Sequence, residues 1–578
     1  MALFKGSREA PPEAEGEAAT ECMKVGQALV EGGQITAENL AAALAQANGD
    51  LLQFGDIVLG RYGAGRNEVA MAISAATGVP AIDTKGIVIT DEIKGVLDEL
   101  IVRRHCAVAV AEEGTTLVVL CSDPSPSRRS AIEAAADRPV KYVISDPSTV
   151  RTFIDLLYRA DADVSRLVAS LEVVDDQAKL AALAAEVSLD DQAPVIQLVN
   201  RIVSQAMRDR ASDIHIEPLD ETLRVRFRID GHLVVAFTLP MGVHAALTSR
   251  LKIMSSMNIV EKRRPQDGQF STVIDGKEVD VRVASVATVF GEKIVMRILD
   301  KGRSMIGLAE LGFPRETYLH YSKMIHAPFG MVICAGPTGA GKTTTLYASL
   351  LEVNSAGKNI TTVEDPVEYV FPGINQIQTN DQAGLTFATG LKAILRQDPD
   401  VILVGEIRDA DTARIAVQSA LTGHLVLSSL HGTDSVAALH RFLDMGIEAF
   451  LIASSVVGVI GQRLLRRICD SCKEPYTPPA DELAVFRQNS GGSEKSTFYR
   501  GAGCNFCANT GYRDRIGVYE LLRITPELRR LIVGWATTEE LRRLAVAQGM
   551  RTMLREAMAL VENDVTTIPE VVKTLFAS

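Results

Sequence analysis

The sequence has no long apolar stretch. None of its apolar runs reaches the roughly eighteen consecutive residues that a membrane-spanning helix needs. The first segment, MALFKGSREAPPEAEGEAATE, also lacks the apolar centre of a secretory signal peptide. Its Ala, Glu and Pro content predicts a disordered segment over residues 1–21. We therefore expect a cytoplasmic protein whose membrane contact is made through partner proteins.

An excess of positive charge is also missing. The chain has 60 basic and 72 acidic residues, which gives a net charge of −12. Non-specific binding along nucleic acid needs a basic stripe, and we find no aromatic, basic channel motif. Direct binding to nucleic acid is therefore not expected, although a local basic patch remains open.

Cysteine is scarce, and half of the eight cysteines are clustered. Cys469-x-x-Cys472 and Cys504-x-x-Cys507 are two pairs whose internal C-x-x-C spacing is typical of tetrahedral zinc. The 31 residues between the pairs are more than in the commonest zinc ribbons, but an insert such as RQNSGGSEKST can loop out. Two disulfides or a redox pair are the alternatives, but a reducing cytosol and the lack of a thioredoxin-like context disfavour both. We predict a structural Zn²⁺, because four thiolates leave no open coordination position. The scattered thiols, Cys22, Cys106, Cys121 and Cys334, are expected to be buried and inert.

The length of the chain predicts several domains. Residues 22–160 are expected to form a small α+β domain, with two helices in VGQALVEGGQITAENLAAALAQ, an N-cap at Thr36, and two strands in CAVAVAEEGTTLVVLCSDP. Residues 161–191 are rich in Ala and Asp and predict a helical linker.

Residues 192–307 predict a second α+β domain. An amphipathic helix opens it, and LRVRFRIDGHLVV then alternates apolar residues with arginines around the turn Asp230-Gly231. KEVDVRVASV alternates in the same way. We expect a sheet with helices on one side.

Residues 308–578 alternate apolar strands with helices. The strands are expected in GMVICAG, NITTVED, DVILVGE and GHLVLSSL, an order that predicts a parallel sheet in an α/β domain. The part after about residue 448 is predicted to be mostly helical, apart from the cysteine insert at about 465–515.

The segment GPTGAGKT matches the phosphate-binding signature G-x-x-x-x-G-K-[ST] completely, between an apolar strand and a helical pattern. Its backbone N–H groups and the helix start favour phosphate. Lys342 is expected to reach the β and γ phosphates of a nucleoside triphosphate, and the Thr343 hydroxyl to bind Mg²⁺. The predicted nucleotide-binding residues are Gly336, Pro337, Thr338, Gly339, Ala340, Gly341, Lys342, Thr343 and Thr344.

Carboxylates follow two of the predicted strands. Glu406 ends the strand in DVILVGEIRD, where an acid that holds the Mg²⁺ shell is expected, here through a water ligand. TTVEDPVEY places Glu364, Asp365 and Glu368 at another strand end, where a carboxylate can orient the attacking water. A solvated, charged loop is the alternative for these three acids.

Two histidines and two arginines complete the candidate site. His424 and His431 flank the strand in TGHLVLSSLHGTDS and fit either a γ-phosphate sensor or an ordinary hydrogen-bonding role. Arg297 interrupts the apolar strand KIVMRIL, so its charge needs a partner, and Arg282 lies on the polar face of its strand. Both lie outside the domain of the phosphate loop. They fit arginine fingers from another domain or subunit, or ordinary strand-face arginines.

The motifs together resemble the GspE/PilB-type secretion ATPases of type II secretion and type IV pilus assembly. The resemblance rests on GPTGAGKTTT, VEDPVEY, DPDVILVGEIRD and TGHLVLSSLHGTDS, and on ASDIHIEP, RVRFRIDG, EKRRPQDG and TVFGEKIVMRILD in the second domain. It extends over residues 22–575 or so. It implies a RecA-like ATPase domain with a parallel sheet, preceded by a PAS-like α+β domain and a small N-terminal docking domain, with a tetracysteine zinc insert.

The resemblance also implies roles for the site residues. Glu368 would act on the attacking water, with Glu364 and Asp365 in support, and Glu406 would be the Walker B acid. His431 matches the main histidine of the family's histidine motif and His424 the other. Arg282 and Arg297 match arginines that reach the nucleotide.

For the whole protein, the resemblance implies a homo-hexameric motor that uses ATP, Mg²⁺ and Zn²⁺. It would lie in the cytoplasm, peripheral at the inner membrane, with an inner-membrane platform and cytoplasmic adaptor proteins as partners. Hydrolysis would drive assembly of a pilus or pseudopilus and so export protein.

Two departures from the family pattern are visible. Gly432-Thr433 follows the second histidine where the family commonly has Thr-Asn. Some N-terminal domains of this type bind cyclic di-GMP through two repeats that begin Arg-Leu-Gly, whereas this chain has Lys24-Val25-Gly26 and QFGDIVLGRYG. Because lysine cannot stack on guanine and fork to phosphate as arginine does, the repeats weigh against cyclic di-GMP binding without excluding it.

Three alternative functions remain at this point. A motor for DNA uptake or conjugation is disfavoured by the negative net charge. A pilus ATPase regulated by cyclic di-GMP is disfavoured by the repeats. A non-catalytic nucleotide sensor is disfavoured by the intact set Lys342, Thr343, Glu368 and Glu406.

Overall fold

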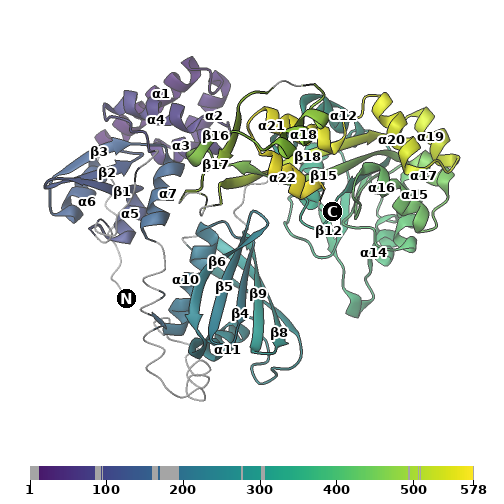
Figure 1. The fold of residues 1–578 in the computed structure, drawn as a ribbon, viewed down its shortest axis with the longest axis horizontal. Coiled ribbons are helices and arrows are strands. Elements are labelled where there is room, and N and C mark those ends of the chain that lie inside the picture. Colours follow the sequence, from purple (N-terminus) through teal and green to yellow (C-terminus); the bar gives the residue numbers. More distant parts are fainter. Residues whose placement is uncertain are drawn as a thin grey trace. The chain divides into compact units, whose positions relative to one another are not determined.

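The chain divides into two compact units. A computed structural model (Figure 1) describes residues 12–84, 87, 93, 96–158, 164, 167–168, 194–274, 277–300, 306–492, 495–504, 507 and 510–576. One unit is Met1–Arg166 and the other Leu167–Ser578. Among the helices of the described residues, none is long and apolar enough to cross a membrane.

The first unit begins with four helices, α1 (Pro12–Glu31), α2 (Ala37–Ala47), α3 (Leu51–Gly60) and α4 (Arg66–Thr77). Thr36 caps α2 as predicted, and its Oγ1 accepts a hydrogen bond from Asn39 N at 3.2 Å. Residues 12–21 are helical where composition predicted disorder. Ala and Glu are strong helix formers and Pro12 suits a first helical turn. Residues 1–11 of that predicted segment lie outside the described residues.

A three-stranded sheet follows in the same unit. Its strands β1 (Ala107–Glu113), β2 (Thr116–Cys121) and β3 (Val140–Ile144) lie in that order, with helices α5 (Glu99–His105), α6 (Pro126–Ala136) and α7 (Pro147–Leu157). The strand pair predicted from CAVAVAEEGTTLVVLCSDP is confirmed. The scattered thiols, Cys22, Cys106, Cys121 and Cys334, are buried as predicted. Desolvation raises the pKa of Cys22 and Cys121 to about 12, which agrees with the low reactivity expected of them. Most of the predicted linker over 161–191 lies outside the described residues.

The second unit opens with a sheet domain. Helix α10 (Pro194–Arg208) precedes a six-stranded antiparallel sheet with the order β6-β5-β4-β9-β8-β7. The strands are β4 (Asp213–Pro218), β5 (Thr222–Ile229), β6 (His232–Pro240), β7 (Gln266–Ile274), β8 (Lys277–Thr288) and β9 (Gly291–Asp300), and α11 (His244–Met254) lies between β6 and β7. The predicted hairpin is confirmed: Asp230 and Gly231 have φ of 48° and 88°, as its two-residue turn requires.

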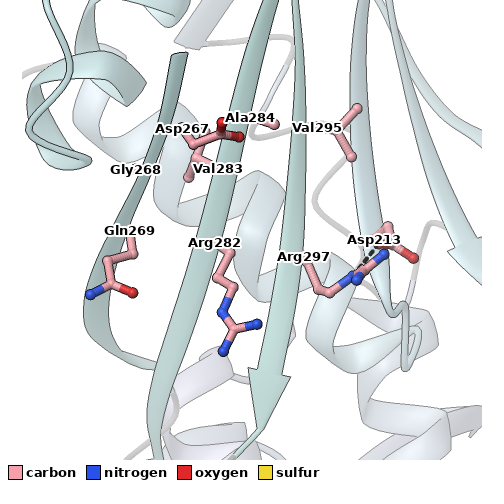
Figure 2. A pocket seen from close by; sticks show the side chains of 9 residues that line it. All are labelled: Asp213, Asp267, Gly268, Gln269, Arg282, Val283, Ala284, Val295 and Arg297. Carbon is pink, nitrogen blue, oxygen red and sulfur yellow. Dashed lines mark hydrogen bonds and ion pairs between the residues drawn. The ribbon is translucent and has the colours of Figure 1, made fainter. Parts of the chain in front are cut away.

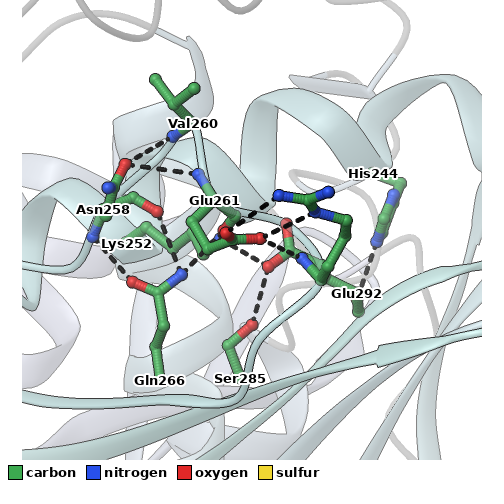
Figure 3. A network of polar contacts seen from close by, with 9 residues as sticks. His244, Lys252, Asn258, Val260, Glu261, Gln266, Ser285 and Glu292 are labelled. Carbon is green, nitrogen blue, oxygen red and sulfur yellow. Dashed lines mark hydrogen bonds and ion pairs between the residues drawn. The ribbon is translucent and has the colours of Figure 1, made fainter.

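A buried ion pair ties α11 to this sheet (Figure 3). Lys252 is 1% exposed; its Nζ pairs with the Glu292 carboxylate and donates to the backbone oxygen of Glu261 at 2.7 Å. Glu292 also accepts a hydrogen bond from Ser285 Oγ at 3.1 Å. Gln266 Nε2 donates to the backbone oxygens of Glu261 and Asn258 at 2.8 and 3.0 Å. The loop between α11 and β7 is therefore held by Gln266 and by the buried Lys252 ammonium group.

Replacing Lys252 with alanine is expected to lower the free energy of unfolding by about 3–5 kcal/mol, because it leaves the buried Glu292 carboxylate without a counter-charge. The double variant Lys252→Met/Glu292→Leu removes both charges and should recover most of that loss. Urea unfolding followed by circular dichroism measures both. Lys141→Ala, which removes an exposed ion pair with Glu113, is the control and should change stability by less than about 1 kcal/mol. A similarly small loss for Lys252→Ala would contradict the prediction.

The rest of the second unit is a three-layer α/β domain. Its seven-stranded sheet has the order β12-β11-β13-β14-β10-β15-β18 and is parallel except for β18, so the predicted parallel sheet is confirmed. The first five strands along the chain are β10 (Gly330–Ala335), β11 (Ile360–Glu364), β12 (Asn375–Gln378), β13 (Val401–Val404) and β14 (Leu425–Leu430). Helices α12 (Arg315–Ile325) and α13 (Lys342–Val353) pack in one apolar cluster with the sheet. Helices α14 (Phe387–Ile394), α15 (Ala410–Leu421), α16 (Ser435–Asp444) and α17 (Ala449–Ser455) pack in the other.

The part after residue 448 is less helical than predicted. β15 (Val456–Ile468) pairs with the phosphate-loop strand β10, and β18 (Tyr512–Arg523) pairs antiparallel with β15. The apolar run of β15 has no periodicity that separates strand from helix, so its neighbours β10 and β18 decide its conformation. β16 (Lys473–Tyr476), α18 (Ala480–Asn489) and β17 (Phe498–Gly501) lie between these strands, and α19 (Pro526–Val533), α20 (Thr538–Ala547), α21 (Met553–Glu562) and α22 (Ile568–Leu575) end the chain.

Candidate nucleotide-binding site

The phosphate loop lies between a fully buried strand and a helix, as predicted. β10 ends at Ala335 and α13 begins at Lys342. Gly339 and Gly341 have φ of 78° and 85°, which other residues rarely adopt. A Cβ atom at Gly336 would lie 2.7 Å from the backbone oxygen of Gln462. Glycine at these positions is therefore required by the backbone path itself.

The Lys342 ammonium group folds back over the loop. Its Nζ donates to the backbone oxygens of Gly336 and Pro337 at 2.8 and 3.1 Å. Desolvation by burial lowers the pKa of Lys342. Thr343 lies half-buried in the first turn of α13. A cation and the N–H groups of a helix start thus face the same space, which suits a polyphosphate.

The Glu406 carboxylate lies between the side chains of Arg408 and His431. Its Oε2 accepts hydrogen bonds from Arg408 at 2.8–2.9 Å, and Arg408 also lies 3.7 Å from Asp365. Its Oε1 lies 2.6 Å from His431 Nε2. That buried oxygen nevertheless has no hydrogen bond of good geometry within the described residues. Glu406 is close enough to the loop for its charge to act on Lys342, and an oxygen with unused acceptor capacity there fits a Mg²⁺ shell, because hard cations prefer oxygen ligands.

Glu364 and Glu368 share one tyrosine. Glu364 is 4% exposed and its carboxylate accepts hydrogen bonds from Tyr347, Thr362 and Gln376. The hydroxyl of Tyr347 also accepts a hydrogen bond from the backbone N–H of Glu368 at 3.3 Å. Glu364 therefore positions the loop that carries Glu368, in agreement with a supporting role.

The environment of Glu368 favours a base. The residue is exposed, but protein atoms crowd its carboxyl group, and this desolvation raises the pKa above its ordinary value. The positive charges of Arg282 and Arg297 oppose that rise, and Glu364 adds to it. A raised pKa makes the carboxylate a better proton acceptor near neutral pH.

His424 does not join the other predicted residues. It lies at the start of β14, whereas His431 follows the end of that strand. The phosphate loop follows the end of the parallel neighbour β10, so the strand length of about 20 Å separates His424 from it. His424 Nδ1 instead lies 2.9 Å from the backbone oxygen of Ser419 in the last turn of α15. Within this chain the structure does not bring His424 to the phosphate loop, so its contribution to nucleotide binding stays a prediction.

Arg282 and Arg297 lie on neighbouring strands of the sheet domain and line a pocket of about 530 Å³ (Figure 2). The predicted need of Arg297 for a partner is confirmed: its Nε donates to Asp213 Oδ1 at 3.1 Å. Asp213 was missed because its partner lies 84 residues away.

Two further residues were missed beside the phosphate loop. Gln462 on β15 accepts hydrogen bonds from the Thr345 hydroxyl at 2.8 Å and the Cys334 thiol at 3.3 Å. Arg463 is 6% exposed and donates to the backbone oxygen of Thr433, two residues after His431, at 2.8 Å. The sequence did offer a signal, because these two polar residues interrupt the apolar run GVIGQRLLRRI. Arg297 was singled out in the same way, since it interrupts the apolar strand KIVMRIL.

The four clustered cysteines converge. Their Sγ atoms all lie within 4.8 Å of one another, and three of the separations are 3.7, 3.8 and 3.9 Å. Ligands about 2.3 Å from a tetrahedral zinc lie about 3.8 Å apart, so the arrangement fits that ion. Hydrogen bonds from Cys469 and from the backbone N–H groups of Cys504 and Gly511 lower the pKa of Cys507 to about 4. All four are thiols and not disulfides.

Comparison with known proteins agrees with this architecture. Residues 188–573 match the family model described as type II/IV secretion system protein. The chain belongs to the type II/IV secretion system protein family. Residues 77–164 match the MshEN domain model.

Relatives of two kinds are similar over much of the chain. The type IV pilus assembly ATPase PilB of Myxococcus xanthus is 37% identical over 95% of this chain and 98% of its own length. The type II secretion system protein E of Xanthomonas campestris is 37% identical over 89% and 92%. The type II secretion system ATPase E of Vibrio cholerae is 48% identical over 59% and 68%.

A solved structure supports the fold. The DotB ATPase of Yersinia pseudotuberculosis matches with a TM-score of 0.50 and 19% identity, over 66% of this chain and 94% of that one. At this identity the likeness concerns the fold alone. The multidomain α/β architecture of this family member, with its parallel-sheet ATPase domain, thus agrees with the one predicted from the sequence.

Proposed function

We propose that this chain is the motor ATPase of a machine that assembles a type IV pilus or a type II secretion pseudopilus. The family makes it an ATPase. The observation that carries the proposal is the meeting of the phosphate loop with Glu406 and His431, since β10, β13 and β14 are adjacent parallel strands that end at one sheet edge. Ligands of such sheets bind at that edge.

The side chains divide the chemistry among them. The loop N–H groups and Lys342 bind the phosphates, and Glu368 orients the attacking water and accepts its proton. Thr343 and Glu406 hold Mg²⁺, which neutralises charge on the phosphates. Arg408 and His431 keep the Glu406 carboxylate in place. We propose that Arg282 and Arg297 contact the triphosphate from the sheet domain.

The assembly and its partners are part of the same proposal. The relatives named above supply the comparison: one is a pilus assembly ATPase and the others belong to type II secretion. We propose a cytoplasmic homo-hexamer docked at the inner membrane through residues 22–160, with residues 192–307 and 308–578 as the moving domains. Zn²⁺ bound by the four cysteines would be structural. A direct titration with cyclic di-GMP tests whether the first unit binds this nucleotide.

The proposal is tested by Mg²⁺-dependent ATP hydrolysis of the purified full-length protein. Hydrolysis is expected, and Lys342→Ala should abolish it because the main phosphate cation is removed. Single-stranded DNA should not stimulate the reaction, since the chain carries a net charge of −12. Absence of hydrolysis would contradict the ATPase role, and strong stimulation by DNA would favour a nucleic-acid motor instead.

A further inference from the structure

A row of polar side chains crosses the sheet domain on its solvent face. The cross-strand partners are Gln269 and Arg282, then Arg282 and Arg297, then Arg297 and Asp213, and finally Asp213 and Arg228. Directly opposed residues share a face of a sheet. Figure 2 shows Gln269, Arg282, Arg297 and Asp213 side by side along the pocket. The row combines residues from five strands, so it exists only in the folded sheet.

Asp213 holds Arg297 by one particular nitrogen. Arg297 Nε donates to Asp213 Oδ1 at 3.1 Å, while the Arg297 side chain remains 65% exposed. A guanidinium has five N–H donors in a planar fork. Anchoring it at Nε leaves the end-on edge of the fork, which has one N–H from each terminal nitrogen, outside the contact with Asp213. That edge can form a bidentate contact with phosphate.

Asp213 is itself fixed in place. It is 7% exposed, its Oδ2 accepts a hydrogen bond from Ser212 Oγ at 2.8 Å, and Arg228 Nε lies 3.7 Å from the same oxygen. Arg282 differs from Arg297: within the described residues, no hydrogen bond or ion pair to its guanidinium is found. The two arginines of the pocket are thus unequal, one oriented and the other not.

Asp213 also sets the charge of the pocket. The ionisable side chains that line it are Asp213, Asp267, Arg282 and Arg297, so their charges cancel. Without the Asp213 carboxylate the pocket would carry one positive charge. Removing Asp213 should therefore strengthen the general attraction of an anion while releasing the orientation of Arg297.

We propose that Asp213 is a positioning residue that presents the terminal nitrogens of Arg297 to the triphosphate of ATP. This inference rests on the proposed function, in which the sheet domain contacts the nucleotide. Orientation matters most where charge develops in the transition state. The attraction of the nucleotide in the ground state depends mainly on charge. Asp213 therefore acts on kcat more than on KM.

The test is ATP hydrolysis by full-length variants at fixed ionic strength. Asp213→Ala is expected to lower kcat about tenfold, because small losses of orientation are costly, while KM for ATP stays equal or falls by up to about threefold. Asp213→Asn retains an oxygen that can accept from Arg297 Nε. It should recover kcat to within about threefold of the wild type. A rise in KM with unchanged kcat, or equal losses for both variants, would overturn the proposal.

A double-mutant cycle identifies the arginine through which Asp213 acts on kcat. In an Arg297→Ala background, Asp213→Ala should lower kcat no further, because the side chain it orients is gone. In an Arg282→Ala background the tenfold effect should persist. Additive losses with Arg297→Ala would show that Asp213 acts by another route and would overturn the proposal.

Glu217→Gln is the matched control for folding. Glu217 lies on the same strand, is 6% exposed and is paired with Arg224, Arg226 and Lys293. It lies about 13 Å along β4 from Asp213, beyond the screening length at physiological salt. Its replacement should lower the unfolding temperature at least as much as Asp213→Ala while leaving kcat and KM within about twofold. If Glu217→Gln reproduced the loss of kcat, the Asp213 effect would be one of stability alone.

The ATPase function and the positioning role of Asp213 are tested separately. If the wild type does not hydrolyse ATP, the proposed function fails. If the wild type is active and Arg297→Ala is equally active, the ATPase role stands and the positioning role of Asp213 is overturned.

Discussion

Glu368→Gln should lower kcat for ATP hydrolysis by about 10²–10⁴-fold, the usual contribution of a general base. Glutamine is nearly isosteric and keeps the backbone hydrogen bond to Tyr347, but it cannot accept the proton of the attacking water. ATP affinity should change little, since Lys342 and the loop are untouched. Steady-state phosphate release gives kcat, and equilibrium binding of a fluorescent nucleotide gives the affinity.

Glu352→Gln is the matched control, because Glu352 is an exposed carboxylate on α13 in the same domain. Its kcat should stay within about twofold of the wild type. A Glu368→Gln enzyme with wild-type turnover would contradict the assignment of the base and would direct attention to Asp365 or Glu406.

The pH profile gives a second check on the base. Desolvation of its carboxyl group raises the pKa of Glu368 above its ordinary value of 4.5, so the carboxylate is present above that raised pKa and is lost as the pH falls through it. The acid limb of kcat/KM in the wild type should therefore lie above pH 4.5 and be absent from the residual activity of Glu368→Gln. An acid limb unchanged in Glu368→Gln would belong to another group.

Removal of the predicted zinc should have the largest effect on stability. In Cys507→Ser the ion loses one of its four thiolates, and structural zinc typically contributes on the order of 10 kcal/mol to the folding of small metal domains. We expect stoichiometric zinc in the wild type by atomic absorption, little or none in Cys507→Ser, and a loss of at least about 3 kcal/mol in the unfolding transition. Chelation of the wild type should reproduce that loss.

The cysteine insert joins β15 to β18, and β15 carries Gln462 and Arg463 beside the phosphate loop. Loss of zinc should therefore also weaken nucleotide binding. Cys22→Ala is the control, because it removes a buried thiol of the first unit without changing the zinc content. Full occupancy of Cys507→Ser, or a zinc-free wild type with unchanged stability, would contradict a structural metal site.

Local sequence patterns were sufficient to predict several parts of the fold. The phosphate loop, the hairpin at Asp230-Gly231 and the cap at Thr36 are encoded within a few residues, because backbone conformation there depends on glycine, on turn residues or on one side-chain hydrogen bond. The alternation of apolar strands and helices gave the parallel sheet for the same reason.

Reasoning from local patterns failed where residues far along the chain determine the conformation or position of a segment. β15 was expected to be helical, and it is a strand because β10 and β18 supply its hydrogen bonds. His424 was grouped with His431 because of the family's histidine motif, and the structure places the two residues before and after β14. The helix over residues 12–21 shows the opposite case, in which local helix propensity decided the conformation and overall composition wrongly predicted disorder.

The sequence by itself determined that this protein binds a nucleoside triphosphate, carries acids at the correct strand ends and has a four-cysteine cluster. Those features depend on short motifs, in which the covalent chain itself keeps the residues close together. Only the tertiary structure placed Glu406 between Arg408 and His431, set Gln462 and Arg463 behind the phosphate loop, and paired Arg297 with Asp213. Each of these contacts except the pair Glu406–Arg408 joins separate strands or loops, and the pairing of strands, not the order of residues, decides which side chains meet.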